Sequence, residues 1–155
     1  MALPDIVQSS LTEYFRMVQS EVHQLTAPLS TEQIWRRPYS YGNSIGNLIL
    51  HLNGNFNYYI GTQLAGTEYV RHRPSEFTNT GQPKEDLIRD FDAAIEIAVT
   101  TLARQSADDW TEPYEAENEP ESHDRFTMFF RCAAHAYHHV GQIIYLQREL
   151  LKTVS

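Results

Sequence analysis

The sequence contains a single cysteine, Cys132, among its 155 residues. One cysteine excludes an intramolecular disulfide. Apolar runs are also short, and no stretch approaches the roughly 18 apolar residues that a membrane-spanning helix needs. The N-terminus lacks the basic region and apolar segment of a signal peptide. These absences predict a cytoplasmic protein that does not interact with membranes.

Positive charge is scarce too. Twelve Lys and Arg residues face 20 Asp and Glu residues, which gives a formal net charge of −8. Binding to a phosphate backbone requires clustered cations, so the composition argues against a nucleic-acid partner. The sequence also has no Gly-rich phosphate loop, no Gly-x-Ser-x-Gly elbow and no Cys-x-x-Cys pair. The corresponding classes of enzyme are therefore excluded as first hypotheses.

The chain does contain long segments in which apolar residues recur every three or four positions. That period is typical of amphipathic helices. The expected helices cover residues 4–25, 44–64, 83–102 and 124–152. With no segment of alternating polarity, the pattern predicts an all-α, up-down antiparallel four-helix bundle that forms one domain over residues 1–155. In such a bundle we expect the second and fourth helices to lie diagonally, both facing the centre.

Local signals mark the ends of these helices. Ser30 and Gln33 form a capping-box pattern, which predicts a short helical turn after the first helix. Ser44 is a suitable N-cap for the second helix, and Gly66 is a suitable stop. Pro83 suits the first turn of the third helix. Residues 67–83 and 111–123 are expected to be loops because they are polar and interrupted by prolines.

Three glycines lie inside the expected second helix: Gly46, Gly54 and Gly61. Each costs about 1 kcal/mol relative to alanine in a helix interior. Close approach of a neighbouring backbone would explain them.

The fourth helix carries His135, His138 and His139 within five residues. Residues four apart on a helix are about 40° apart around its axis, so His135 and His139 lie on one face and can converge on one metal ion. His138 is a rim residue or a substitute ligand. The surrounding helix is apolar, and burying two imidazoles in it is costly unless their nitrogens find partners. Cys132, one turn earlier, is interpreted as a small residue in a tight helix interface.

His51 is the candidate third ligand. It lies between Asn47 and Asn55 at four-residue spacing, which forms a narrow polar stripe on an otherwise apolar helix. Such a stripe typically lines a cavity or a site. A buried histidine that is hydrogen-bonded within the bundle is the alternative. Three imidazoles at His51, His135 and His139 would leave an open coordination position for zinc, nickel, iron or manganese. Gln142 could orient a ligand or a bound water.

Three phrases of the sequence resemble the DinB-like family of four-helix metal-binding proteins. They are Leu29-Ser-Thr-Glu-Gln-Ile-Trp35, Asn43-Ser-Ile-Gly-Asn-Leu-Ile-Leu-His-Leu-Asn-Gly-Asn55 and His135-Ala-Tyr-His-His-Val-Gly-Gln-Ile143. The resemblance implies a bundle with one metal ligand from the second helix and two from the fourth, at His51, His135 and His139. It also implies a homodimer. Some members use the metal to activate a low-molecular-weight thiol as an S-transferase or isomerase.

The leading hypothesis is therefore a metal-dependent thiol S-transferase acting on a small molecule. Arg71, Arg73 and Arg131 are candidates for binding the anionic groups of the thiol or substrate. One alternative is a metal-dependent hydrolase, although no carboxylate is expected beside the histidines to act as general base. The other alternative is a non-enzymatic, stress-associated dimer that binds a metal or another ligand.

Overall fold

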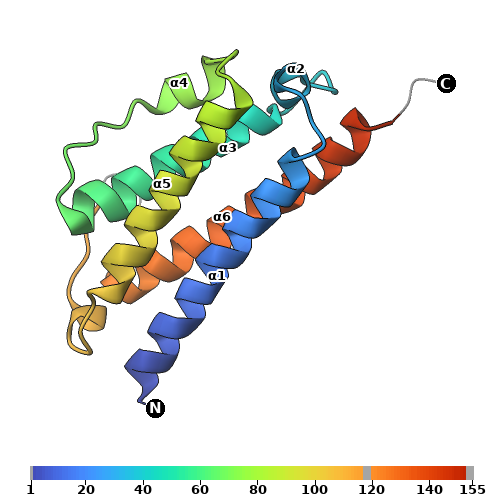
Figure 1. Ribbon diagram of the computed structural model, residues 1–155. Helices are drawn as coiled ribbons and strands as arrows, with labels where there is room; N and C mark the ends of the chain where they lie inside the picture. The colour runs from blue at the N-terminus through green and yellow to red at the C-terminus, as the bar shows by residue number, and fades with distance from the viewer. Residues whose placement is uncertain (1, 117–119, 153–155) are drawn as a thin grey trace.

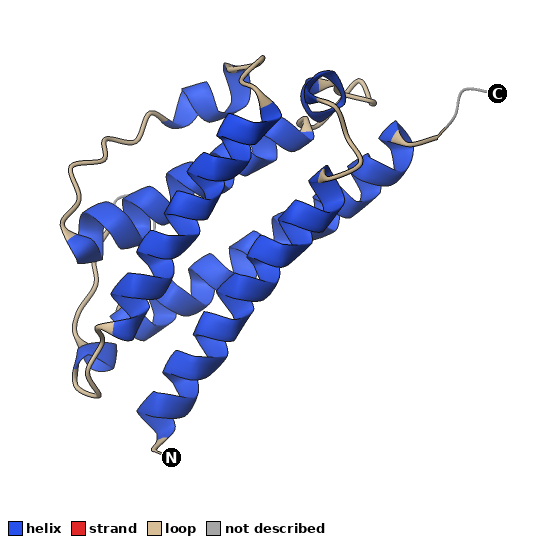
Figure 2. Ribbon diagram, viewed as in Figure 1, coloured by secondary structure: helices blue, strands red, loops and turns tan. Residues whose placement is uncertain are grey.

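The computed structural model describes residues 2–116 and 120–152, which are mostly helical (Figures 1 and 2). In chain order the elements are α1 Leu3–Thr26, α2 Thr31–Trp35, α3 Ile45–Phe56, η1 Asn57–Ala65, α4 Arg73–Thr78, α5 Lys84–Ala103, η2 Asp109–Thr111 and α6 Arg125–Leu150. No strand occurs within these ranges. The β-type pairing found there is an isolated antiparallel bridge between Pro113 and Asp124. The expected all-α fold with antiparallel packing of long helices is confirmed.

The helix ends agree closely with the local signals in the sequence. The Ser30 side chain accepts a hydrogen bond from the Gln33 amide, and the Gln33 side chain accepts one from the Ser30 amide, which completes the capping box. Ser44 caps α3 through the Asn47 amide. Gly66 ends the second long helix in the left-handed conformation, with φ of 69°. The last nine residues of that helix, η1, have π-helical rather than α-helical hydrogen bonding.

The four long helices are arranged so that α1 and α6 run in one direction, and α3 and α5 run in the other (Figure 1). The neighbouring pairs are α1 with α6, α1 with α5, α3 with α5, and α3 with α6. The expectation that the second and fourth helices would be diagonal is therefore wrong: α3 and α6 are antiparallel neighbours. The long connection between η1 and α5 returns the chain to the other end of the bundle, so α5 packs parallel to α3.

Helix α3 is buried on almost all of its surface, and its glycines explain how this is possible. A Cβ atom at Gly46 would collide with the Trp35 ring, and one at Gly54 would collide with Oε1 of Glu76. At Gly61 in η1 the nearest atom would be Oγ1 of Thr67, at 3.1 Å. A close approach is present at all three positions, but the expectation that a neighbouring backbone makes it is wrong. Side chains, rather than neighbouring backbones, make it.

The region expected to be a loop at residues 67–83 contains the short helix α4. The buried side chain of Asn47 fastens this helix to α3. Its Nδ2 donates to the carbonyl oxygens of Glu76 and Asn79, at 3.1 and 3.0 Å. Its Oδ1 accepts from the Ser44 hydroxyl at 2.8 Å. Asn47, the first residue of the polar stripe that the sequence indicated on α3, therefore holds an extra helix against the bundle.

The second expected loop, 111–123, is described except for residues 117–119. Its two ends pair through the Tyr114 amide and the His123 carbonyl, and through the Arg125 amide and the Glu112 carbonyl. Across the described ranges, no helix combines the length and apolarity needed to cross a membrane.

Candidate metal centre

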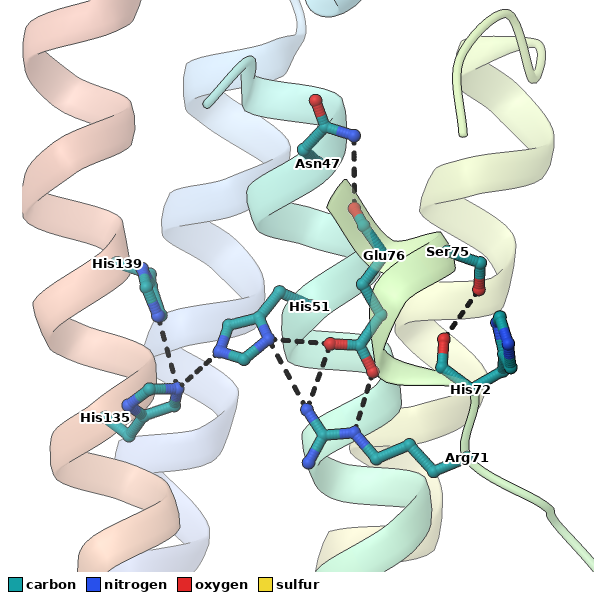
Figure 3. Close-up of polar contacts among 8 residues, drawn as sticks. All are labelled: Asn47, His51, Arg71, His72, Ser75, Glu76, His135 and His139. Carbon is teal, nitrogen blue, oxygen red and sulfur yellow. Dashed lines mark hydrogen bonds and ion pairs between the residues drawn. The ribbon is translucent and has the colours of Figure 1, made fainter. Parts of the chain in front are cut away.

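Three histidine side chains from α3 and α6 converge between those helices (Figure 3). Nε2 of His135 lies 2.9 Å from Nε2 of His51 and 3.2 Å from Nε2 of His139. Among the described residues, these three side chains form a group whose candidate ligand atoms all lie within 4.8 Å of one another. The four-residue spacing on α6 and the α3–α6 contact therefore bring three imidazole nitrogens to one point.

A carboxylate and a guanidinium lie behind His51. Oε2 of Glu76 is 2.8 Å from Nδ1 of His51, and Glu76 is 5% exposed. Arg71 donates to both oxygens of the same carboxylate, from Nε at 2.7 Å and from a terminal nitrogen at 3.0 Å. Burial by itself would raise the pKa of Glu76, but the hydrogen bonds from His51 and Arg71 outweigh it and hold that pKa below its usual value. Glu76 is therefore ionised at neutral pH.

These outer contacts fix the imidazole tautomers. An ionised carboxylate accepts hydrogen bonds, so Nδ1 of His51 carries the proton and its Nε2 has a free lone pair. Nδ1 of His139 lies 2.7 Å from Oε1 of Gln142, which likewise places the proton on Nδ1 and leaves Nε2 bare. Nε2 of His51 and Nε2 of His139 both point at Nε2 of His135. That nitrogen carries one proton at most, so it can donate a hydrogen bond to only one of the two.

The two imidazoles of α6 lie where positive charge is disfavoured. Burial, together with the neighbouring histidines and Arg131, lowers the pKa of His135 to about 3. Burial also lowers the pKa of His139 to about 4, although the hydrogen bond to Gln142 opposes the shift. These two rings are neutral at physiological pH. Neutral imidazole is the form that binds metals.

The donor set fits a divalent metal ion. Three imidazole nitrogens converge, and two of the outward-facing nitrogens have partners of the kind that orient metal-binding histidines. Three protein ligands would leave coordination positions for water or substrate, which is typical of catalytic rather than structural sites. With nitrogen donors alone, zinc, nickel and iron are better matched than calcium or magnesium.

The structure gives the three candidate arginines different surroundings. Arg71 supports Glu76, and its guanidinium also lies 5.5 Å from the centre of the Tyr59 ring. Arg73 is exposed and lies over Phe77, 5.4 Å from the ring centre. Arg131, on α6, is near enough to His135 for its charge to lower the histidine pKa. The charge of Arg131 therefore bears on the α6 side of the cluster, and that of Arg71, with a terminal nitrogen 3.4 Å from Nδ1 of His51, bears on the α3 side. Anion binding by all three arginines stays a prediction.

Two other residues near the histidines are not part of the converging group. His138 is exposed, and its ring centre lies 5.2 Å from that of His139. Cys132 is buried, with its sulfur 3.6 Å from the Met128 sulfur. These positions agree with the expectation of a rim histidine and an interface cysteine.

Glu76 is the site residue that sequence reasoning missed. The sequence predicts no carboxylate beside the histidines, because it predicts a loop at residues 67–83. A usable signal was present in Arg73-Pro-Ser-Glu76, since proline is favoured in the first turn of a helix and acidic residues are favoured there too. That pattern could have placed Glu76 on a helix, although not against His51.

Comparison with known proteins agrees with this fold. A crystal structure of a conserved protein from Enterococcus faecalis superposes with a TM-score of 0.76, covering 97% of this chain and 98% of that one, at 15% sequence identity. At this level of identity the likeness shows the fold alone. No curated protein matches the sequence. Residues 5–154 match the family DUF1572, described as a protein of unknown function, and the chain belongs to that family.

Proposed function

We propose that His51, His135 and His139 hold a divalent metal ion, and that the protein is a metal-dependent thiol S-transferase. One observation carries the proposal: three imidazole nitrogens within 4.8 Å of one another, two of them with bare lone pairs fixed by Glu76 and Gln142. Converging lone pairs without donors are costly in a helix bundle. A role in packing alone would therefore not explain them.

A divalent ion bound there would lower the pKa of a coordinated thiol, so that thiolate is available at neutral pH. In the transfer, the thiol sulfur forms a bond to an electrophilic carbon, a leaving group departs from that carbon, and the thiol proton passes to solvent. The chain's own contribution is orientation. Glu76 holds the His51 ring and Gln142 holds the His139 ring, while Arg131 provides positive charge for an anionic group of the thiol.

The proposal includes a relationship to the DinB-like bundles, which rests on the phrases around His51 and His135 and on the shared pattern of one ligand from α3 and two from α6. A homodimer belongs to the same proposal. Light scattering after size-exclusion chromatography would test it directly, with a mass of twice 17.9 kDa expected.

Metal content is the first test. Untagged protein purified without chelators is compared with the double variant His135→Ala/His139→Ala by inductively coupled plasma mass spectrometry. We expect close to one equivalent of zinc, nickel, iron or manganese in the wild type and almost none in the variant. Wild-type protein that stays metal-free after supplementation with all four ions would overturn the proposal.

Thiol chemistry is the second test. Metal-loaded protein is incubated with glutathione, bacillithiol or mycothiol and a chlorinated aromatic electrophile, and conjugation is followed by absorbance. Conjugation that depends on His51, His135 and His139 is expected. Hydrolysis of esters or amides without thiol would instead favour a hydrolase. Bound metal without either activity would favour the non-enzymatic alternative.

A further inference from the structure

A cavity of about 590 Å³ lies between α6 and the connection from α2 to α3. This volume is within the range of pockets that bind small molecules. The lining residues are Tyr39, Tyr41, Gly42, Asn43, Leu48, His138, Gly141, Gln142, Tyr145 and Leu146. None of these described lining residues carries a fixed charge, and three are tyrosines. Arg71, Arg73 and Arg131 do not line it.

No contact within the chain explains why residue 141 is a glycine. It lies in the middle of α6 with an ordinary helical backbone, where glycine is less favourable than alanine. The glycines at 46, 54 and 61 each avoid a close contact, but a Cβ atom at Gly141 would meet nothing within 4 Å. The space beside Gly141 is therefore left open, and it belongs to the cavity that Gly141 lines.

The cavity walls favour a flat, uncharged occupant. The rings of Tyr39 and Tyr41 are stacked, with centres 5.4 Å apart and planes 9° from parallel. Tyr41 and Tyr145 are 74% and 73% exposed, which leaves large aromatic surfaces facing water. An aromatic molecule would cover these surfaces, and the amides of Asn43 and Gln142 could hydrogen-bond its polar atoms.

Gln142 connects this cavity to the histidine cluster. It lines the cavity, and its Oε1 accepts the hydrogen bond from Nδ1 of His139. On the opposite wall, Leu48 lies one helical turn before His51 on α3. The cavity is thus adjacent to the cluster on both ligand-bearing helices.

We propose that this cavity binds the electrophilic substrate, an uncharged aromatic molecule, and that Gly141 keeps the space for it. The assignment of the molecule as the electrophile rests on the proposed function, whereas its binding in the cavity does not. The division of the site follows from charge: the anionic thiol lies on the Arg131 side, and the neutral partner lies among the tyrosines.

The test measures binding of N-phenyl-1-naphthylamine, an uncharged aromatic probe whose fluorescence increases when it leaves water. Its sulfonated analogue, 1-anilinonaphthalene-8-sulfonate, has the same rings with a negative charge. The variant Gly141→Leu places a large side chain in the cavity, and Gly141→Ala is a milder version that favours the helix. Ala134→Leu is the matched control, because Ala134 lines a separate apolar groove of about 350 Å³ between α1 and α6. Metal content is measured on every sample.

We expect Gly141→Leu to weaken binding of the uncharged probe at least tenfold, Gly141→Ala to weaken it less, and Ala134→Leu to leave it within twofold. The sulfonated probe should bind wild type at least tenfold more weakly than the neutral one. Loss of binding in Ala134→Leu alone, or equal binding of the two probes, would overturn the proposal. Conversion of a wild-type dimer to a monomer by Gly141→Leu would overturn it too, because the cavity would then be an interface between copies. Unchanged metal content in Gly141→Leu separates this result from failure of the metal centre.

Discussion

The carboxylate of Glu76 lies 2.8 Å from Nδ1 of His51, although 25 residues separate them in the chain. The contact directs the other ring nitrogen of His51 toward His135 and His139 (Figure 3). Partners of this kind set the orientation and basicity of metal-binding imidazoles. Glu76 therefore belongs to the same connected group of side chains as the three histidines.

Replacing Glu76 should weaken metal binding without removing a ligand. In Glu76→Gln the charge that fixes the His51 tautomer is lost, and we expect metal affinity to fall about 10- to 100-fold. Competition with a chromophoric chelator measures this. Glu68→Gln is the control, since Glu68 is exposed in the same connection. Equal affinity of Glu76→Gln and wild type would show that the carboxylate has no part in metal binding.

Two glycine-to-alanine changes should have opposite effects on stability. Gly54→Ala places a methyl group against the buried carboxylate of Glu76, and we expect it to destabilise the fold by about 1–3 kcal/mol. Gly141→Ala meets open space, so the helix preference should stabilise the fold by about 0.5–1 kcal/mol. Urea denaturation of the metal-free proteins measures both. Stabilisation by Gly54→Ala would contradict the packing described for α3.

The metal-free protein should lose stability in mild acid. The pKa values of His135 and His139, about 3 and 4, are below the ordinary 6.5. Between these limits the unfolded chain binds more protons than the folded one, so the free energy of unfolding falls as pH falls from 6.5 toward 4. Glu76 acts in the same direction, because its lowered pKa favours the folded state only while it is ionised.

Thermal melts of chelator-treated protein at several pH values test this dependence. The double variant His135→Ala/His139→Ala should show a smaller decrease in melting temperature between pH 7 and pH 5. Parallel pH profiles for wild type and variant would show that these histidines do not titrate as described.

Removing the side chain of Asn47 should release α4. Asn47→Ala leaves the carbonyl oxygens of Glu76 and Asn79 without their donor, at an expected cost of about 1–3 kcal/mol. Hydrogen exchange should accelerate most in residues 73–79, and metal affinity should fall along with it. Asn57→Ala is the matched control, since Asn57 bonds to the Asn53 carbonyl within its own helix. Unchanged exchange in α4 would show that other contacts hold it.

The parts of the fold that could be predicted are those that short-range patterns determine. Apolar periodicity located the four long helices, and Ser30, Ser44 and Gly66 marked ends that the structure confirms. The convergence of His135 and His139 followed from helix geometry, and His51 was identified by its polar stripe. Each inference used residues within about eight positions of one another.

What could not be predicted depends on how distant segments pack. The prediction that the second and fourth helices are diagonal is wrong. The length of a loop does not determine which helix the following helix packs against. Glu76 was missed for the same reason: its role depends on α4 lying against α3, which the Asn47 side chain arranges. No local sequence pattern near Glu76 predicts its contact with His51.

The neighbouring position of α3 and α6 has a consequence for chain entropy. His51 and His135 are 84 residues apart, so an ion shared between them would close a loop of more than half the chain. In a protein whose single cysteine permits no internal disulfide, that ion would serve as a reversible cross-link. Closing such a long loop restricts the unfolded chain, so metal availability would set how often the bundle opens.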